Sequence, residues 1–419
     1  MDSAVEIHTD VACPFCGLAC DDLTVETGAG NAAVRSKGCS RSIESYRRIA
    51  LHKSARAAVA GQTVDLDLAL AECARILRNA HRPAIGGLAT DVAGVRAALA
   101  LADQLGAAVD HVNGAGLSRN LLCVQDRGWI TTTFSEVRNR ADLVVIAGEK
   151  PMLAFPRLAE RLLGKNRIGQ NDREPTVISI SSSAPDTSAL DGPIEHLPCD
   201  VDQLGDLFAV LLGLLAGRCD STTGFGPLSR ATLGGLVERL RGARYGVLIW
   251  TADEFDFPHA ELAIGAMNAL LVALNETTRF AGLPLAGSDG DLTANFVCTW
   301  QTGLALPVSF AGGRVDYDPS RFRTEQMLER GEVDALVWIS SLDPEREPPP
   351  TAVPTIVLGC GTMRLPAEPA VQIDVATPGV HHAGHWVRAD GAVTVRLRGL
   401  LESELPSVAE VLSRVSAMI

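Results

Sequence analysis

Cys13-Pro-Phe-Cys16-Gly-Leu-Ala-Cys20-Asp21-Asp22 stands near the start of the chain, and a fourth cysteine, Cys39, follows at the end of a glycine-containing turn. The spacing places three thiols on one tight loop and brings the fourth in from a neighbouring turn. Four thiolates suit an iron–sulfur cube or a structural zinc ion. We therefore predict a metal site whose ligands are Cys13, Cys16, Cys20 and Cys39, and the thiols alone leave open which of these groups, if any, it holds.

Composition bounds the class of protein. The chain has 419 residues, of which 47% are hydrophobic and 21% charged, so it can bury a large core in two or three lobes. The net charge is −13 and the basic residues are scattered, which argues against nucleic acid and anionic membranes as partners. The longest apolar runs, such as 207–216, are shorter than the roughly 20 residues of a membrane span. No signal-peptide pattern precedes the first cysteine, so we expect a cytoplasmic protein.

In a reducing cytoplasm, closely spaced cysteines bind metal more often than they form disulfides. The other cysteines are isolated among apolar or turn residues, and we expect them to be buried bystanders. They are Cys73, Cys123, Cys199, Cys219, Cys298 and Cys360.

After the first 50 residues, short apolar runs alternate with amphipathic segments, which is typical of an α/β layered fold. The runs predict strands that are covered on both faces, at 83–86, 142–147, 176–180, 245–250, 334–339, 354–358 and 371–375. Apolar residues three and four apart predict helices at 65–79, 92–105, 202–215, 260–274 and 406–418. The Gly-rich stretch 282–290 is among the expected breaks, and the first 50 residues form a small unit of their own.

The cysteine stretch resembles the N-terminus of the B subunit of formylmethanofuran dehydrogenase, a member of the molybdopterin oxidoreductases. The likeness continues over nearly the whole chain. Other matching segments are Gln125-Asp126-Arg127-Gly128, Phe134–Asp142, Gly148-Glu149-Lys150-Pro151-Met152, Val297-Cys298-Thr299-Trp300, Phe310-Ala311-Gly312-Gly313 and Tyr317-Asp318-Pro319.

Three positions that the resemblance marks as functional have changed. The cysteine that ligates molybdenum or tungsten in that family falls at Gly116, which has no donor atom, and the histidine after it falls at Leu117. A glycine and a lysine between cluster and pterin fall at Ser42 and Ser45. The Asp-Pro-Arg that contacts a pterin nucleotide falls at Ser181–Ser183. We therefore expect no catalytic residue in this chain and no molybdopterin or tungstopterin.

The pattern of losses resembles the B subunit of the formyltransferase/hydrolase complex of methylotrophic bacteria. That resemblance implies a non-catalytic scaffold in a complex that converts formyl-tetrahydromethanopterin to formate through a methanofuran-type carrier. Its expected partners are a hydrolase-type, a transferase-type and a further structural subunit. Two alternatives stay open: an active tungsten or molybdenum formylmethanofuran dehydrogenase subunit, and a small-molecule binder that uses the vacated pterin cleft.

The same resemblance implies the domain order. We expect a four-cysteine domain at 1–55, a first Rossmann-like, doubly wound lobe at 56–130 and 277–400, a second such lobe inserted at 131–276, and a C-terminal helix at 401–419.

Three weaker signals complete the sequence pattern. His381, His382 and His385 lie within five residues and suit a metal site or a general base, or a loop of solvated histidines. Ser118 and Ser181–Ser183 lack the Gly-x-Ser-x-Gly turn of a serine nucleophile, so plain turns are expected. The consecutive Asp21 and Asp22 favour a solvated turn over a carboxylate pair.

Overall fold

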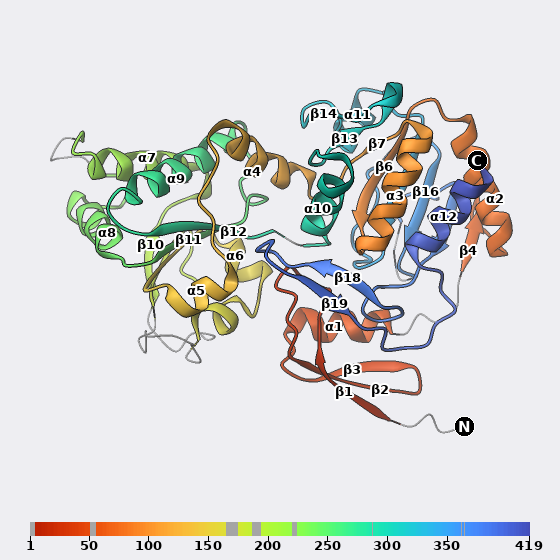
Figure 1. The fold of residues 1–419 in the computed structure, drawn as a ribbon, viewed down its shortest axis with the longest axis horizontal. Coiled ribbons are helices and arrows are strands. Elements are labelled where there is room, and N and C mark those ends of the chain that lie inside the picture. The colour runs from red at the N-terminus through yellow and green to blue at the C-terminus, as the bar shows by residue number, and fades with distance from the viewer. Residues whose placement is uncertain are drawn as a thin grey trace. The chain divides into compact units, whose positions relative to one another are not determined.

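The structure is a computed structural model that describes residues 5–50, 56–164, 175–186, 194–219, 224–286, 288–361, 363 and 365–419. The chain divides into two compact units, one formed by Met1–Ala115 and Gly287–Ile419 and the other by Gly116–Ala286. Figure 1 shows the elements of both.

The first unit is built on a mixed sheet whose strand order is β14-β13-β7-β6-β15-β16-β17-β4-β5. Neighbours from β7 to β17 are parallel, and the strands at both edges are antiparallel. The strands are β4 (Ala57–Val59), β5 (Gln62–Val64), β6 (Pro83–Ala89), β7 (Ala108–Val109), β13 (Val308–Ser309), β14 (Asp316–Tyr317), β15 (Ala335–Ser340), β16 (Thr355–Gly359) and β17 (Val371–Asp374).

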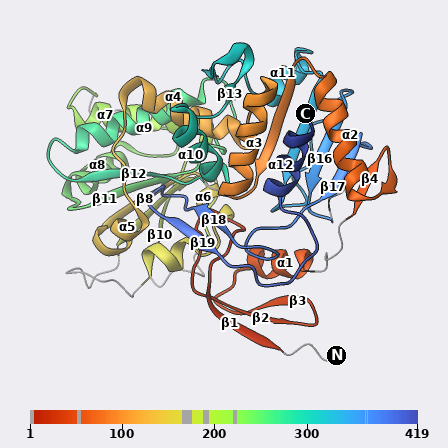
Figure 2. The same cartoon turned by 45° about the vertical axis from the view of Figure 1, so that its right-hand side comes forward.

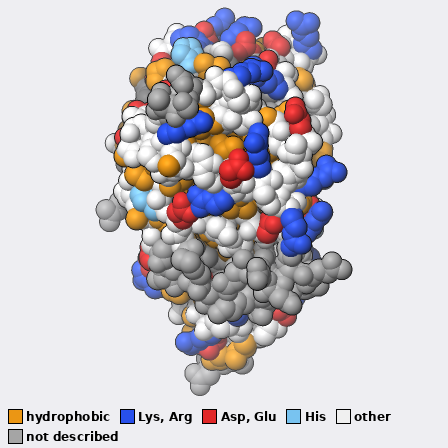
Figure 3. Space-filling view, turned by 90° about the vertical axis from the view of Figure 1, so that its left-hand side faces the viewer, with side chains coloured by type: hydrophobic (Ala, Val, Ile, Leu, Met, Phe, Trp, Pro, Cys, Tyr) orange, Lys and Arg blue, Asp and Glu red, His pale blue; other side chains and the backbone are white. Residues whose placement is uncertain are grey.

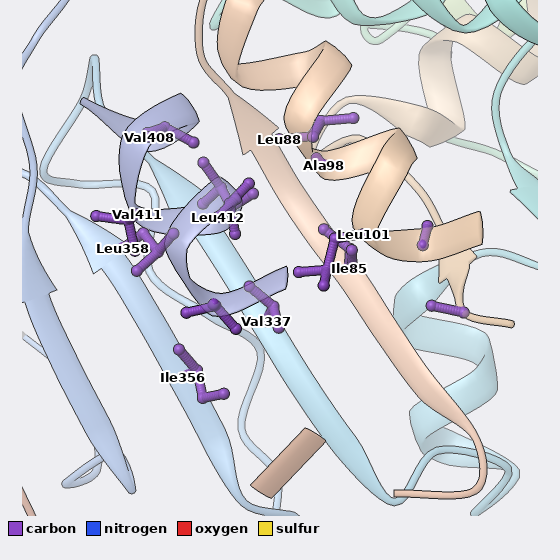
Figure 4. Close-up of a cluster of buried hydrophobic side chains, with 14 of the residues drawn as sticks. Ile85, Leu88, Ala98, Leu101, Val337, Ile356, Leu358, Val408, Val411 and Leu412 are labelled. Carbon is purple, nitrogen blue, oxygen red and sulfur yellow. The ribbon is translucent and has the colours of Figure 1, made fainter. Parts of the chain in front are cut away.

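Helices cover both faces of this sheet because successive strand residues point to opposite sides. On one face, α2 (Leu66–Asn79), α3 (Val92–Leu105) and α12 (Val408–Met418) lie side by side (Figures 1 and 2). They enclose a core that includes Ile85, Val337, Ile356 and Leu358 (Figure 4). On the other face, the neighbouring strand residues Leu336, Trp338 and Val357 pack with Met327 of α11 (Thr324–Glu329). The unit also contains α10 (Asp291–Thr302) and a short 3₁₀ turn at Ala311–Gly313.

The cysteine-bearing segment adds a separate antiparallel sheet of β1 (Glu6–Val11), β2 (Leu23–Gly28) and β3 (Asn31–Ser36), followed by α1 (Ser40–Ile49). The loop between β1 and β2 lies against the hairpin of β18 (Gly384–Val387) and β19 (Thr394–Leu397), where the Ala389 amide donates to the Gly17 carbonyl at 2.7 Å. Figure 2 shows this arrangement below the large sheet. An ion pair between Arg48 and Glu345, at 2.8 Å, adds a second link.

The second unit is built on a five-stranded parallel sheet in the order β10-β9-β8-β11-β12. Its strands are β8 (Leu143–Ala147), β9 (Thr176–Ser181), β10 (Ile194–Pro198), β11 (Gly246–Trp250) and β12 (Phe280–Pro284). Its helical segments are α4 (Gly114–Arg127), α5 (Phe134–Arg140), α6 (Lys150–Ala154), a π-helical turn at Ala159–Leu163, a 3₁₀ turn at Val201–Gln203, α7 (Leu204–Leu215), α8 (Arg230–Gly242) and α9 (Ala260–Leu274).

The α/β class expected from the sequence is confirmed, and each expected strand and helix overlaps an observed one. The expected break at 282–290 contains the boundary between the two units, at Ala286 and Gly287. It begins too early, however, because β12 runs through Gly282 to Pro284 and pairs with β11. A Cβ at Gly282 would stand 2.8 Å from the Trp250 ring, so glycine serves packing there rather than a turn. Since β12 belongs to this sheet, the second unit extends past residue 276, the end expected for the inserted lobe.

Within the described residues, no helix combines the length and the apolar character that crossing a membrane requires. On the face shown in Figure 3, basic and acidic side chains are interspersed among uncharged ones.

Candidate functional site

The cysteine loop gathers its three thiols through its own backbone. The Cys13 amide donates to the Cys20 carbonyl at 2.8 Å, and the Ala19 amide donates to the Cys16 carbonyl at 3.2 Å. All three side chains are buried, with exposures of 5 to 7%. Cys39 is half-buried and joins them from the start of α1. The ten cysteines of the chain, all within described segments, form no disulfide.

Burial controls the protonation of these thiols. Burial, and then the neighbouring Cys16, raises the pKa of Cys13 well above its ordinary value, and Cys20 and Cys39 raise it further. Burial likewise raises the pKa of Cys16, although the Arg41 guanidinium opposes the rise. These couplings place all four sulfurs in one electrostatic neighbourhood. Without a cation beside them, the Cys13 and Cys16 thiols stay protonated near neutral pH.

Cys39 also caps α1. The Ser42 amide donates to the Cys39 sulfur at 3.5 Å, while the Cys39 amide donates to the Ser42 hydroxyl at 2.9 Å. This reciprocal pair is a capping box, in which a sulfur takes the usual place of a serine oxygen. Ser42 stands where the resemblance places the family's glycine, and here it serves the helix end.

The fit of the four-cysteine set to a metal rests on donor chemistry and on one unpaired atom. Among the described residues, no group of three or more His, Cys, Asp or Glu side chains stands in an arrangement that could hold an ion. The chemistry of the donor set nevertheless matches a four-thiolate centre. In addition, Tyr46 packs on Phe15 of this loop, and its buried hydroxyl has no hydrogen-bond partner in the segments that the structure describes. Donor chemistry and the unpaired hydroxyl both fit a metal-bound state of the cysteines.

Gly116, where the resemblance places the family's metal ligand, lies in the first turn of α4. A Cβ at this glycine would stand 3.0 Å from both the amide nitrogen and the Cβ of Asp253. The segment that carries Asp253 is fixed to α4, because Arg119 donates to the Ala252 carbonyl at 3.2 Å and forms an ion pair with Asp256 at 2.6 Å. The helix therefore approaches this segment at a distance that suits glycine and disfavours any side chain.

At the carboxyl end of β8, backbone amides that could bind a ligand bind an internal carboxylate instead. Gly148 adopts a φ of 90°, and the amides of Glu149 and Lys150 after it point at the Glu254 carboxylate, at 2.7 and 3.0 Å. Exposed amides at such an edge commonly bind phosphate groups. Here an internal carboxylate occupies them, and burial raises the pKa of Glu254. Lys150 is also engaged, since its Nζ lies 2.6 Å from Asp253.

Ser181–Ser183 follow the neighbouring strand β9 and bond mainly to one another and to nearby groups. The Ser181 hydroxyl donates to the Ser183 carbonyl at 2.8 Å, and the Ser183 amide donates to Glu149 at 2.8 Å. A hollow of about 400 Å³ lies beside them. Its lining residues are Gly148, Glu149, Met152, Leu153, Pro156, Ser179, Ser181, Ser183, Ala184, Pro185 and Asp186. Among the described residues of this lining, the titratable side chains are those of Glu149 and Asp186, and both are acidic, which disfavours an anionic ligand.

The three histidines occupy different environments. His381 is buried and its Nδ1 accepts from the Thr377 amide at 3.1 Å. His382 is half-buried, with Nδ1 2.8 Å from the Ala383 carbonyl, and His385 is exposed on β18. The described residues hold no metal-binding group of three that includes them. Ser118, weighed as a nucleophile, is buried in α4. Asp21 is exposed and Asp22 half-buried.

A buried polar cluster in the first unit escaped sequence reasoning. The Asp289 side chain is 2% exposed and lies 2.7 Å from Arg346 and 3.8 Å from Arg41. His111 lies beneath it, with Nε2 3.1 Å from the Asp289 carbonyl and Nδ1 accepting from the Asn113 amide at 3.0 Å. Burial lowers the pKa of His111 to about 3. These residues are far apart in sequence and share no motif, so the fold alone brings them together.

Comparison with known proteins places the chain in a family. No family model matches it. The B subunit of the formyltransferase/hydrolase complex Fhc from Methylorubrum extorquens is 31% identical over 331 residues, which cover 77% of this chain and 85% of that protein. The chain belongs to the family of this B subunit. The family resemblance inferred from the cysteine stretch and its companion segments is thereby confirmed.

One further related protein and one solved structure are also similar to this chain. The B subunit of tungsten-containing formylmethanofuran dehydrogenase 2 from Methanocaldococcus jannaschii is 28% identical over 95% of this chain and 94% of its own length. A chain of the crystal structure of FhcABCD from Methylorubrum extorquens, solved in complex with methylofuran, matches with a TM-score of 0.73 and 27% identity. That match covers 86% of this chain and 98% of the other.

Proposed function

We propose that this chain is the B subunit of a formyltransferase/hydrolase complex and acts there as a scaffold without a reaction of its own. The complex would transfer the formyl group of formyl-tetrahydromethanopterin to a methanofuran-type carrier and release formate. Hydrolase-type and transferase-type subunits and a further structural subunit would be its partners, in the cytoplasm. Membership of the B-subunit family carries this proposal.

The close approach at Gly116 supports the loss of a metal-ligating side chain. A thiolate ligand needs a Cβ, and the Asp253 segment occupies the space that a Cβ would take. Glu254 supports the loss of pterin binding, because a carboxylate already accepts the two amides at the edge where a nucleotide phosphate would bind. We accordingly propose that the chain carries neither molybdopterin nor tungstopterin.

The finer architecture belongs to the same proposal. The N-terminal four-cysteine segment would be a distinct domain, and the two sheets with their helices would be Rossmann-like lobes of the molybdopterin oxidoreductase type. We propose that Cys13, Cys16, Cys20 and Cys39 hold a [4Fe-4S] cluster or a zinc ion that stabilises the domain. Four thiolates would supply the whole coordination of either group.

Two measurements on protein purified anaerobically test the proposal. Affinity purification of the tagged chain from its host is expected to recover the transferase-type and hydrolase-type subunits in constant ratio. Elemental analysis is expected to find tungsten and molybdenum far below one per chain, with no extractable pterin. Tungsten or molybdenum near one per chain, together with pterin, would instead establish the alternative of an active dehydrogenase subunit. A monomer that recovers no partner would overturn the scaffold function.

A further inference from the structure

Tyr46 presents an unexplained polar atom beside the four cysteines. It lies on α1 and is 0% exposed, and its buried hydroxyl oxygen has no hydrogen-bond partner among the described residues. Buried hydroxyls are nearly always hydrogen-bonded, because an unpaired one loses its water without compensation. A phenylalanine would pack in the same place and avoid this loss. The hydroxyl therefore calls for a partner that the described part of the chain does not supply.

The position of the ring points to that partner. The Tyr46 ring meets the edge of Phe15 with centroids 5.0 Å apart and planes at 89°. Phe15 is part of the Cys13-Pro-Phe-Cys16 turn, so the tyrosine packs directly on the cysteine loop. Burial raises the pKa of Tyr46, and the nearby Cys13 sulfur raises it further. Because Phe15 lies between Cys13 and Cys16 in the sequence, the ring contact brings Tyr46 to the turn that carries both thiols.

We infer that the Tyr46 hydroxyl donates a hydrogen bond to the Cys13 sulfur when a metal centre holds that sulfur as a thiolate. The inference rests on the proposed occupancy of the four-cysteine site. A protonated thiol is a weak acceptor, whereas a thiolate is a strong one, so the hydrogen bond depends on the bound metal. Zinc and an iron–sulfur cluster both present such a thiolate. Tyr46 is then a positioning residue, which orients a ligand and neutralises part of its charge.

Tyr46→Phe tests the inference because it removes one oxygen and keeps the packing on Phe15. The matched control is Tyr245→Phe in the second unit. The Tyr245 hydroxyl already has protein partners, donating to Glu136 at 2.6 Å and lying 2.8 Å from the Thr132 hydroxyl. Its loss should lower the melting temperature equally with and without metal. Tyr46→Phe should leave the melting temperature of the metal-free full chain unchanged or raised, and lower that of the metal-loaded chain.

Metal binding supplies the second readout. In the zinc arm, competition with a chelator should show that Tyr46→Phe weakens zinc binding by about tenfold to a hundredfold, as is usual for residues that support a ligand. In the iron arm, anaerobic reconstitution with ferrous iron and sulfide should give a cluster whose midpoint potential is lower in Tyr46→Phe, because hydrogen bonds to sulfur raise it. Tyr245→Phe should change neither quantity.

Three results would overturn the inference. The first is a Tyr46→Phe variant that binds zinc as tightly as the wild type and shows an unshifted cluster potential. The second is a variant that is equally destabilised with and without metal, which would mean that another group accepts the hydroxyl. The third is a wild-type chain that takes up neither zinc nor iron. None of these results bears on recovery of the partner subunits, so the scaffold function stands or falls separately.

Discussion

Replacing Gly116 with alanine tests whether packing excludes a side chain at the position where the resemblance places the family's metal ligand. The added methyl would meet the Asp253 amide nitrogen and Cβ at 3.0 Å and its Cα at 3.1 Å. The neighbouring backbone has little room to yield, because Arg119 and Lys150 hold the segment from both sides. Forcing a methyl into such a contact typically costs about 1–3 kcal/mol.

Helix propensity works in the opposite direction and must be subtracted. Alanine favours a helix over glycine by up to about 1 kcal/mol. The matched control is Gly235→Ala, since Gly235 lies in α8 of the same unit and a Cβ there meets no atom within 4 Å. We expect Gly235→Ala to stabilise the chain by about 0.5–1 kcal/mol. Gly116→Ala should fall below the control by about 1–3 kcal/mol.

Urea unfolding of the two variants and the wild type, followed by circular dichroism, measures the difference. Both substitutions lie in the second unit, so the same transition reports on both. If Gly116→Ala proved as stabilising as Gly235→Ala, the close approach to Asp253 would be refuted, and with it the argument that a side chain is excluded there. A cysteine, with its larger side chain, should be at least as destabilising as alanine.

Other predictions concern protonation, the sheet edge and the helix cap. Because His111 is held neutral by burial, with a pKa lowered to about 3 from 6.5 when unfolded, its stabilising contribution is complete above pH 6.5 and is lost as the pH falls toward 3. Urea unfolding across this range should show a shallower loss of stability in His111→Asn than in the wild type. Glu254→Ala should lower the unfolding free energy by about 2–3 kcal/mol, because two amides lose their acceptor. The control Glu238→Ala, on the exposed face of α8, should change it by less than about 0.5 kcal/mol. Equal effects of the two substitutions would contradict the role given to Glu254. Ser42→Ala should lower the unfolding free energy by about 1 kcal/mol, because the capping box is lost. Ser45→Ala should change it little, and thermal unfolding measures both. A Ser42→Ala variant as stable as the wild type would mean that the cap is dispensable.

The parallel strands could be read from the sequence because each is buried on both faces and is therefore continuously apolar. β8 and β11, at 143–147 and 246–250, are buried at every residue. The strand at 280–284 escaped because its glycine resembles a turn signal, although tertiary packing against Trp250 selects it. Helix α4 escaped for a similar reason, since two glycines in its first turn lower its local propensity.

The site divides in the same way between local and distant contributions. The three cysteines of the loop lie close in sequence, so their spacing alone predicts a shared site. The Glu254 carboxylate accepts a hydrogen bond from the Glu149 amide, 105 residues away, so no local sequence pattern predicts this contact. The buried contact of Asp289 with Arg346 spans 57 residues and was missed for the same reason. Residues that are close in sequence can be assigned to a site from their spacing. Residues that reach a site from a distant element cannot.

A stabilising role for the four cysteines would follow from the small size of the segment that carries them. A three-stranded sheet and one helix, about 50 residues in all, bury too little apolar surface to be stable alone, and segments of this size usually rely on a metal, on disulfides or on neighbouring structure. Here the loop rests on the β18–β19 hairpin, and its thiols form no disulfide. In the proposed scaffold, loss of electron transfer would remove one reason to keep the four cysteines but would leave the stabilising one untouched. A metal in this domain would therefore be selected for holding the cysteine loop against its neighbours, and its removal should loosen that segment while leaving both large sheets folded.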